Sequence, residues 1–288
     1  MTLVNLNEIL KSAQAGHYAV GAFNVTNLEM VDSIVNAAES QHAPVVVQYA
    51  EGDDERITIE KVGYYATEIA RQASVPVVVH LDHGHSFSAC MRAIRCGYSS
   101  VMFDGSELPY DENLETSKEV VKVAHEVGVS VEVELGRMIR SNGRPLTNPD
   151  ITELMTNPDI AGEFSKKTNA DALAVSFGTV HGVYKTVPKL NFDRLKALRE
   201  NIKQPLVVHG GSGLKTEEYQ QMAQMGITKI NFYSDMANRV ARHIVSDLVQ
   251  KGEDIYIQDW TDLQLKYVTD DLAQKIRVFG SANMANIS

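Results

Sequence analysis

Residues 76–84 read PVVVHLDHG, a run of apolar side chains that ends in a cluster of ionisable ones. A nearly continuous apolar run of this length is typical of a parallel β-strand that is buried on both of its faces. The sequence on either side of this segment repeats the same pattern, which predicts further buried parallel strands.

Further short runs rich in β-branched residues predict strands at 18–24, 44–49, 99–103, 130–134, 172–177, 205–209 and 228–232. Segments with helical periodicity separate them, among them 27–41, 58–73, 112–126 and 234–250. Eight strands, each followed by a helix, are the number that closes a (β/α)8 barrel. We therefore predict an α/β protein that folds as a single TIM barrel.

An open doubly wound sheet is the structural alternative. Such a sheet usually carries a GxGxxG turn after its first strand, whereas residues 24–27 read NVTN here. No linker rich in Pro, Gly or Ser divides the chain, so we predict one domain over residues 1–288. Residues 3–15 predict an extra N-terminal helix that closes the bottom of the barrel.

The composition excludes several classes of partner. The 288 residues include 27 Lys and Arg against 37 Asp and Glu, which gives a formal net charge of −10. A general polyanion binder would be basic, so we expect neither nucleic acid nor a membrane as a partner. A small phosphorylated substrate stays compatible with this charge, because backbone N–H groups bind phosphate.

Localisation is predicted from the cysteines and the N-terminus. Cys90 and Cys96 are the only cysteines, and their spacing on a predicted helix points them to different faces. They form no disulfide framework, and no signal peptide is visible at the N-terminus. We expect a cytoplasmic protein.

Histidines gather at the carboxyl ends of the predicted strands, where the active site of a TIM barrel forms. Any one of these histidines would more often be a structural or surface residue. Their coincidence at the ends of the third, sixth and seventh strands, with Glu132 and Glu134 at the end of the fifth, favours a zinc site built from imidazoles and a carboxylate. The five histidines are His80, His83, His85, His181 and His209.

The histidines and the aspartate of the third strand have different expected roles. His80 lies within the strand, so we interpret it as a core residue or a support for the site. Asp82 lies at the mouth, where it could move a proton, orient an imidazole or cap a helix. His85 is interpreted as a rim or helix-cap residue.

Two turns near these histidines have the composition of a phosphate site. Residues 210–213 read GGSG after the seventh strand, and residues 231–234 lead from the eighth strand into a helix. The loops after strands seven and eight often bind phosphate in this architecture, because glycines and a helix N-terminus offer backbone donors. The alternative interpretation of GGSG is a flexible connector.

The stretch 136–160 interrupts the alternation of strands and helices. It is polar and contains three prolines. Loops of this length in compact domains are often lids or binding loops. The alternative is a surface excursion at the top of the barrel.

Taken together, these motifs resemble the class II fructose-bisphosphate and tagatose-bisphosphate aldolase family over almost the whole chain. The segments that carry the resemblance are GAFNV at 21–25, HLDHG at 80–84, DGSELPYDENLETSKEVV at 104–121, VEVELG at 131–136, HGVYK at 181–185, HGGSG at 209–213, KINFYSD at 229–235 and RVFGSA at 277–282.

The resemblance implies roles for particular residues. It implies that His83, His181 and His209 bind a catalytic Zn2+, that Glu134 is an additional ligand and that Asp82 is the catalytic proton carrier. It also implies a monovalent cation, Na+ or K+, near the phosphate. The positions that match the family's contacts to dihydroxyacetone phosphate are Asn24, Gly182, Lys185, Gly210, Gly211, Ser212, Asn231 and Ser234.

The implied reaction is the reversible cleavage of a ketose (bis)phosphate to dihydroxyacetone phosphate and an aldehyde. Asp82 would accept the proton of the C4 hydroxyl, and zinc would stabilise the enediolate as a Lewis acid, so that no lysine Schiff base is needed. The resemblance also implies a role in carbohydrate metabolism such as glycolysis, and a homodimer or homotetramer. Residues 260–280 are a candidate contact helix, or a helix that only closes the barrel.

The chain departs from the family pattern after its fifth strand. Family members commonly carry an acidic stretch there that supplies a proton-transfer acid, whereas residues 136–143 read GRMIRSNG. Asp150, Glu153 and Asp159 are the candidates to replace that acid.

Other departures concern the substrate pocket. Tyr233 occupies a place that is usually Asp, Asn or Ala, and Ala50 replaces a serine that contacts substrate in some members. Ala237 lies near the position of an arginine that binds the far phosphate in some members. The sequence therefore leaves the identity of the ketose phosphate open.

Two other functions compete with an aldolase. A zinc hydrolase on the same barrel often carries an HxH pair at the end of its first strand, whereas residues 23–25 read FNV. A catalytically altered family member could instead bind a sugar phosphate as a regulatory or interaction subunit.

Overall fold

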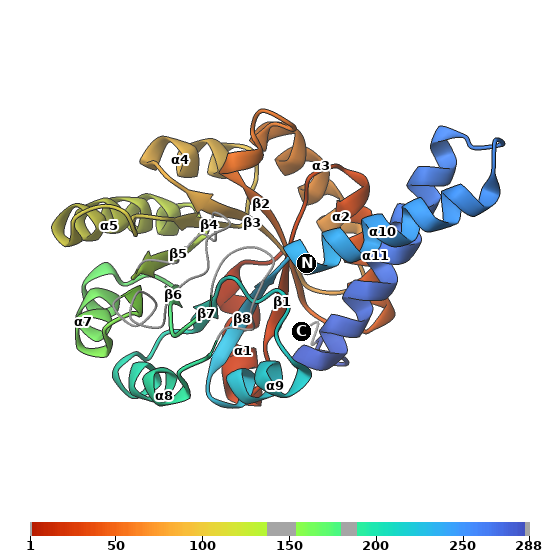
Figure 1. Cartoon of the computed structure of the whole chain (residues 1–288). Helices are drawn as coiled ribbons and strands as arrows, with labels where there is room; N and C mark the ends of the chain where they lie inside the picture. Colours follow the sequence, from red (N-terminus) through yellow and green to blue (C-terminus); the bar gives the residue numbers. More distant parts are fainter. Residues whose placement is uncertain (1, 137–153, 180–188, 286–288) are drawn as a thin grey trace.

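The structure is a computed structural model that describes residues 2–136, 154–179 and 189–285. Parallel strands close into a barrel in chain order, with the last strand beside the first (Figure 1). The eight strands are β1 (Val20–Asn24), β2 (Val45–Ala50), β3 (Val77–Gly84), β4 (Ser100–Phe103), β5 (Ser130–Leu135), β6 (Ala172–Val175), β7 (Leu206–Val208) and β8 (Ile227–Phe232). This confirms the predicted TIM barrel.

Helices surround the barrel as an outer ring (Figure 1). They are α2 (Glu29–Ser40), α3 (Ile59–Gln72), α4 (Phe87–Arg95), α5 (Tyr110–Glu126), α7 (Pro158–Thr168), α8 (Phe192–Asn201), α9 (Thr216–Gln224), α10 (Ser234–Lys251) and α11 (Ile257–Phe279), with a 3-10 turn η1 (Glu51–Asp53) after β2. In the part of the chain that the structure describes, no helix is both long and apolar enough to cross a bilayer.

The surroundings of β3 explain why its sequence is apolar on both faces. Val77 and Val79 pack into the outer core between the strands and the helices. Val78 belongs to the smaller core inside the barrel. Because side chains alternate along a strand, His80 and Asp82 continue the inward-facing row that Val78 begins. The interior of the barrel therefore becomes polar toward the carboxyl end of β3.

The predicted N-terminal helix is α1 (Leu6–Gly16), which closes the bottom of the barrel. A capping box starts it: the Asn5 side chain accepts from the Glu8 backbone N–H, and the Glu8 carboxylate accepts from the Asn5 N–H. Its apolar face, including Leu6 and Leu10, is fully buried in the inner core with Ala22 of β1.

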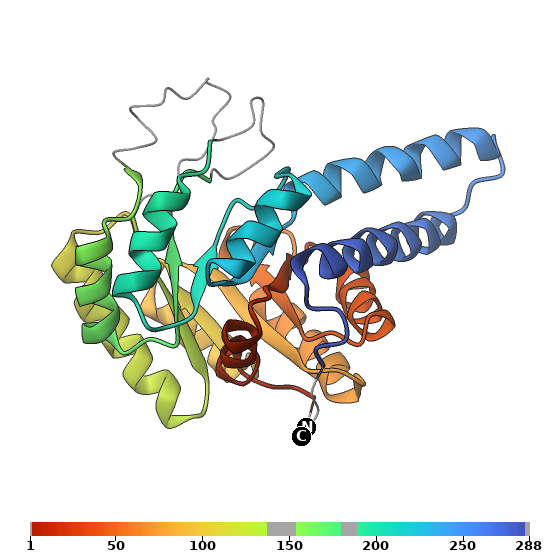
Figure 2. The same cartoon turned by 90° about the horizontal axis from the view of Figure 1, so that it is seen from below.

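Helices α10 and α11 form an antiparallel hairpin that projects beyond the barrel (Figures 1 and 2). Near the barrel α11 is anchored by Leu272, Ile276 and Phe279, which are buried in the outer core. The projecting part, residues 245–260, is here called the arm. Its large exposed apolar side chains are Val245, Val249, Ile255, Tyr256, Ile257 and Trp260.

The two described ends of the chain both lie at the amino ends of the strands. The Thr2 carbonyl accepts a hydrogen bond of 2.7 Å from the N–H of Val77, the first residue of β3. The Ala285 N–H donates to the carbonyl of His42, which precedes β2, at 2.9 Å. This end of the barrel, with α1, is its floor; the opposite end is its mouth.

Candidate active site

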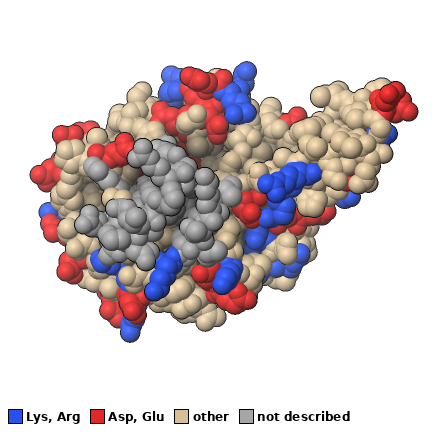
Figure 3. Space-filling view, viewed as in Figure 1, with Lys and Arg blue, Asp and Glu red and all other residues tan. Residues whose placement is uncertain are grey.

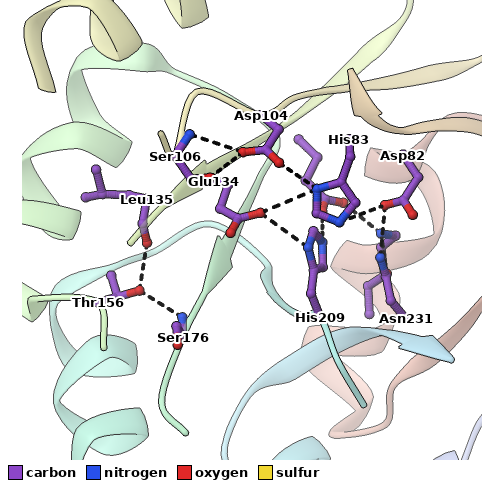
Figure 4. Close-up of polar contacts among 12 residues, drawn as sticks. Asp82, His83, Asp104, Ser106, Glu134, Leu135, Thr156, Ser176, His209 and Asn231 are labelled. Atoms are coloured by element: carbon purple, nitrogen blue, oxygen red, sulfur yellow. Dashed lines mark hydrogen bonds and ion pairs between the residues drawn. The ribbon is translucent and has the colours of Figure 1, made fainter. Parts of the chain in front are cut away.

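Polar side chains from separate strands converge at the mouth of the barrel (Figure 4). Asp82 and His83 come from the end of β3, and Asp104 directly follows β4. Glu134 lies near the end of β5, and His209 directly follows β7. Parallel strands that close a barrel bring their carboxyl ends to one rim, which explains how residues so distant in sequence meet.

A local break in β3 allows both Asp82 and His83 to face the site. Neighbouring residues of a regular strand point to opposite sides. Here the register with β4 shifts between Leu81 and Gly84, and His83 adopts a left-handed backbone conformation with φ of 48°. Such irregularities re-aim side chains next to active sites. The imidazole of His83 is thereby turned to the same side as the Asp82 carboxylate.

Asp104 fixes the orientation of the His83 ring. Its Oδ2 lies 2.7 Å from Nδ1 of His83, and its Oδ1 accepts from both the N–H and the hydroxyl of Ser106, at 3.1 and 2.6 Å. A carboxylate can only accept here, so Nδ1 carries the proton. In the neutral imidazole, Nε2 of His83 is then the nitrogen with a lone pair, and it lies 4.0 Å from Oδ1 of Asp82.

His209 is oriented by a second carboxylate, through its other ring nitrogen. Nε2 of His209 donates to Oε1 of Glu132 at 2.8 Å inside the barrel. Nδ1 lies 3.3 Å from Oε2 of Glu134, and the ring centroids of His209 and His83 are 4.7 Å apart. Histidines that bind metals usually donate their second N–H to a carboxylate in this way.

The donor atoms at the mouth fit a divalent metal ion. Ligand atoms of Asp82, His83 and His209 lie within 4.8 Å of one another, and so do those of His83, Asp104 and Glu134. Imidazole nitrogens and carboxylate oxygens in such a cluster suit zinc. The structure thus brings together three of the four predicted ligands. The fourth, His181, lies outside the described residues, so the ligand set stays a prediction.

The carboxylates around His209 favour a positive charge on its ring. Burial alone would lower the pKa of His209, but the carboxylates of Glu132 and Glu134 outweigh it and raise the pKa to about 10. Two buried carboxylates therefore hold positive charge at this position. A metal ion that binds here would compete with a proton.

Asp82 lies between three amide side chains. Asn24 Nδ2 donates to its Oδ2 at 2.8 Å, Gln48 Nε2 donates to the same oxygen at 3.3 Å, and Asn231 Nδ2 donates to Oδ1 at 3.0 Å. Burial opposes ionisation, but the charges of His83, His209 and Lys229 and the bond from Asn24 lower the pKa of Asp82. The carboxylate is therefore ionised and held in one orientation.

A cavity of about 190 Å³ opens beside Asp82 and His83. Ser212 and Ser234 bring the two predicted phosphate turns to its wall, and Ser234 begins α10. The N–H groups at a helix N-terminus lack partners within the helix and favour anions. The residues that line the cavity are Asn24, Ala50, Asp53, Asp82, His83, Gly210, Ser212, Asn231, Phe232, Tyr233 and Ser234.

The remaining predicted substrate residues do not line this cavity in the described part of the chain. Gly211 is not among the residues that line the cavity, and a Cβ atom there would stand 2.8 Å from Cγ2 of Ile230. Gly182 and Lys185 lie outside the described residues. Ala50 and Tyr233, the departures from the family pattern, do line the cavity together with Asp53.

The other two histidines near the end of β3 lie in different surroundings. His80 is fully buried in the barrel, where its Nδ1 lies 2.8 Å from the Ser100 hydroxyl, and burial is the main cause that lowers its pKa to about 3. His85 lies exposed at the rim, with its backbone N–H donating to Glu51.

The predicted break at 136–160 ends too late, because residues 158–160 belong to α7. Asn157 caps that helix, accepting from the N–H groups of Asp159 and Ile160, and Pro158 is its first residue. Asp159 is therefore an exposed residue of the first turn of α7 and does not line the cavity. The other candidate acids, Asp150 and Glu153, lie outside the described residues.

Several residues that shape the site have no role predicted from the sequence. Asp104 could have been found, because it directly follows a predicted strand at the rim that carries the other polar residues. Lys229 could have been found as a charge inside an apolar strand, because a lysine is rarely buried without a partner. Glu132 is expected near the site together with Glu134, but its contact with His209 is not predicted from the sequence. Gln48 had no such signal, because a single amide at a strand position is common.

Comparisons with known proteins agree with this geometry. The family model described as fructose-bisphosphate aldolase class-II matches residues 4–284. The crystal structure of the YdjI aldolase from Escherichia coli K12 is 32% identical, with a TM-score of 0.87 over 99% of this chain and 100% of that one.

Two further structures are similar. A putative fructose-1,6-bisphosphate aldolase from Coccidioides immitis is 25% identical, with a TM-score of 0.85 over 98% of each chain. The fructose-bisphosphate aldolase from Campylobacter jejuni is 22% identical, with a TM-score of 0.80 over 98% of this chain and 95% of that one, and supports the fold alone. With a family model that spans nearly all of its length, the chain belongs to the class II fructose-bisphosphate aldolase family.

Proposed function

We propose that the protein is a metal-dependent aldolase that reversibly cleaves a ketose (bis)phosphate to dihydroxyacetone phosphate and an aldehyde. The observation that carries this proposal is the meeting of His83, His209 and Glu134 beside Asp82, at the edge of one cavity. Membership of the class II aldolase family supports the reaction type.

Zinc is the proposed metal. His83, His209 and Glu134 would hold it, together with His181 as the resemblance implies. When bound, zinc would supply a Lewis acid for the substrate carbonyl and for the negative charge that develops on cleavage. Asp104 and Glu132 keep the two imidazoles in the tautomers that leave one nitrogen each for a metal.

Asp82 is the proposed base. Its lowered pKa keeps it ionised, and its three amide partners hold it at the cavity. It can therefore accept the proton of the C4 hydroxyl when the C3–C4 bond breaks, and return a proton in the reverse direction.

The phosphate of the triose is proposed to bind at the turns of Gly210, Ser212 and Ser234, where α10 begins. Asn24, Gly211 and Asn231 stay predicted contacts, as do Gly182 and Lys185. A Na+ or K+ ion near this phosphate also stays a prediction.

The quaternary structure is proposed to be a homodimer or homotetramer. The arm extends away from its own barrel, and its large apolar side chains are exposed in the part of the chain that the structure describes, so we expect another molecule to cover them. In the space-filling view the arm is mostly uncharged, with acidic side chains at its tip (Figure 3). A second copy is the proposed partner, because closed symmetric homo-oligomers are the commonest assemblies of soluble proteins.

The decisive assay is a screen of ketose mono- and bisphosphates with zinc present, coupled to detection of dihydroxyacetone phosphate. We expect at least one ketose phosphate to release the triose. Hydrolysis of the phosphate without carbon–carbon cleavage would favour a zinc hydrolase. Substoichiometric zinc and no cleavage of any ketose phosphate would favour a sugar-phosphate-binding protein.

Site variants separate metal binding from proton transfer. We expect His83→Ala and His209→Ala to lose both zinc and turnover, because each removes a ligand. We expect Asp82→Ala to keep zinc but to cleave poorly, because it removes only the base. Zinc content and kinetics measured on the same samples test both expectations. Full zinc content and full turnover in either histidine variant would refute the proposed metal site.

A further inference from the structure

Lys229 of β8 is completely buried, with 0% of its side chain exposed. It shares the barrel interior with Glu132, His80 and His209, which are also buried. Lysine is almost never buried in this way unless its charge is paired. The partners of its ammonium group therefore matter for the function of the site above it.

The ammonium group has two contacts that lead in different directions. Nζ of Lys229 lies 2.9 Å from Oε2 of Glu132 on β5. The same Nζ donates a hydrogen bond of 2.7 Å to Oδ1 of Asn231, two residues along β8. One contact leads toward the predicted metal ligand His209, and the other leads toward Asp82.

The contact with Glu132 determines which ring nitrogen of His209 faces the mouth. With Oε2 held by Lys229, Oε1 of Glu132 accepts from Nε2 of His209 at 2.8 Å. The Nδ1 side of the ring is therefore turned toward Glu134. A glutamate without its cation could rotate or take up a proton, and it would no longer fix this orientation.

The contact with Asn231 determines how Asp82 is held. An ammonium group can only donate, so Asn231 must present its carbonyl oxygen to Lys229. Its Nδ2 is thereby directed at Oδ1 of Asp82, at 3.0 Å. If this amide turned over, it would present an oxygen to the carboxylate, and the hydrogen bond would become a repulsive contact.

We propose that Lys229 is a positioning residue that ties the orientations of His209 and Asp82 to one buried ammonium group, through Glu132 and Asn231. The kinetic part of this inference rests on the proposed aldolase function. The metal-binding part does not, so the two can fail separately. The simpler alternative is that Lys229 only neutralises the buried charge of Glu132.

The central variants are Lys229→Met, which removes the ammonium group at similar length, and the double variant Lys229→Met with Glu132→Gln, which also removes the opposing charge. The amide introduced by Glu132→Gln keeps a carbonyl oxygen that can accept from His209. Lys167→Met is the matched control, because Lys167 is an exposed residue of α7 paired with Glu163. Thermal unfolding establishes which variants are folded.

Two readouts report on the metal, and one reports on the reaction. Zinc affinity is measured by competition with a chelator, and the absorption spectrum of the Co2+-substituted protein reports ligand geometry. We expect Lys229→Met to weaken zinc binding about 10- to 100-fold and to alter the Co2+ spectrum. At saturating zinc we expect kcat to fall at least about tenfold with little change in KM, because an amide that has lost its anchor misplaces the base.

The double variant separates positioning from charge neutralisation. If Lys229 only neutralises Glu132, the double variant should recover stability, zinc affinity and kcat together. If Lys229 positions the site, stability should recover while kcat stays low, because Asn231 still lacks its anchor. Full recovery, or a folded Lys229→Met with unchanged zinc affinity and Co2+ spectrum, would overturn the proposal.

The wild-type protein provides a test that needs no variant to fold. In its zinc-loaded crystal structure, we expect His209 to face the metal with Nδ1 and to keep Nε2 on Glu132. A structure in which Lys229 contacts neither Glu132 nor Asn231 would also overturn the proposal. If the wild-type protein binds zinc as expected but cleaves no ketose phosphate, the proposed function fails while the metal-binding inference stands.

Discussion

The backbone of His83 is the least regular part of the site. A residue other than glycine in the left-handed region costs on the order of 1–3 kcal/mol, and His83 has a φ of 48° next to a register shift in β3. The hydrogen bond to Asp104 and the packing against His209 hold the ring in this position. The strain is therefore located where it places two adjacent ionisable residues on one side of a strand.

Removing the carboxylate that orients His83 should weaken metal binding. We expect Asp104→Ala to lower zinc affinity about 10- to 100-fold, because the His83 ring loses the acceptor that fixes its tautomer. Chelator competition measures the effect. Asp111→Ala, at the exposed start of α5, is the control and should bind zinc as the wild type does. An unchanged affinity in Asp104→Ala would mean that the His83 ring is fixed by other contacts.

At the level of single residues, the sequence predicts a role only where the residue type itself indicates a chemistry, such as metal binding. The ends of the strands revealed His83, His209 and Asp82, because histidines and carboxylates at one rim indicate a metal site. The sequence could not show that Asp82 and His83 face the same way, since a regular strand would separate them. That depends on the bulge, which no residue of HLDHG signals.

At the scale of elements, the apolar runs predicted all of the strands because a parallel sheet is buried on both faces. The break at 136–160 was predicted less well. Asn157 and Pro158 form a common helix start, with a side-chain cap and a proline in the first turn. The polar composition of 136–160 hides this start, because polar residues are common both in loops and at the beginning of a helix.

Helix α1 should contribute strongly to stability. Leu10 is fully buried in the inner core, so we expect Leu10→Ala to lower the free energy of unfolding by about 2–5 kcal/mol. Leu10→Met keeps most of the volume and should cost less than about 1.5 kcal/mol. Chemical denaturation of the zinc-loaded protein measures both. Equal losses in the two variants would argue against a tightly packed floor.

At the scale of the whole molecule, the number of strands was enough to predict a closed barrel, because eight βα units with no Gly-rich first turn fit few other folds. The direction of the α10–α11 hairpin could not be predicted. Helical periodicity identifies a face to be buried but does not say whether the same chain or another one covers it.

The arm should control assembly. We expect the wild-type protein to be a dimer or tetramer. The double variant Val249→Asp with Ile257→Asp should shift toward monomer. The reason is that Val249 and Ile257 are 73% and 84% exposed in one chain, so a charge there would oppose burial against a second copy. Light scattering coupled to size-exclusion chromatography measures the mass. Val127→Asp, on an exposed apolar residue at the end of α5, is the control. A monomeric wild-type protein at micromolar concentration would refute the role of the arm.

The position of Thr2 and Ala285, the two described ends, at the floor of the barrel has a practical consequence. Thr2 and Ala285 are held beside β3 and β2 at the end opposite to the ionisable cluster. An affinity tag, a fluorescent fusion or a surface tether that leaves the protein beside these two residues would therefore lie at the opposite end of the barrel from the cavity beside Asp82 and His83. We therefore expect an immobilised preparation to keep the metal binding and the proposed activity of the unattached protein.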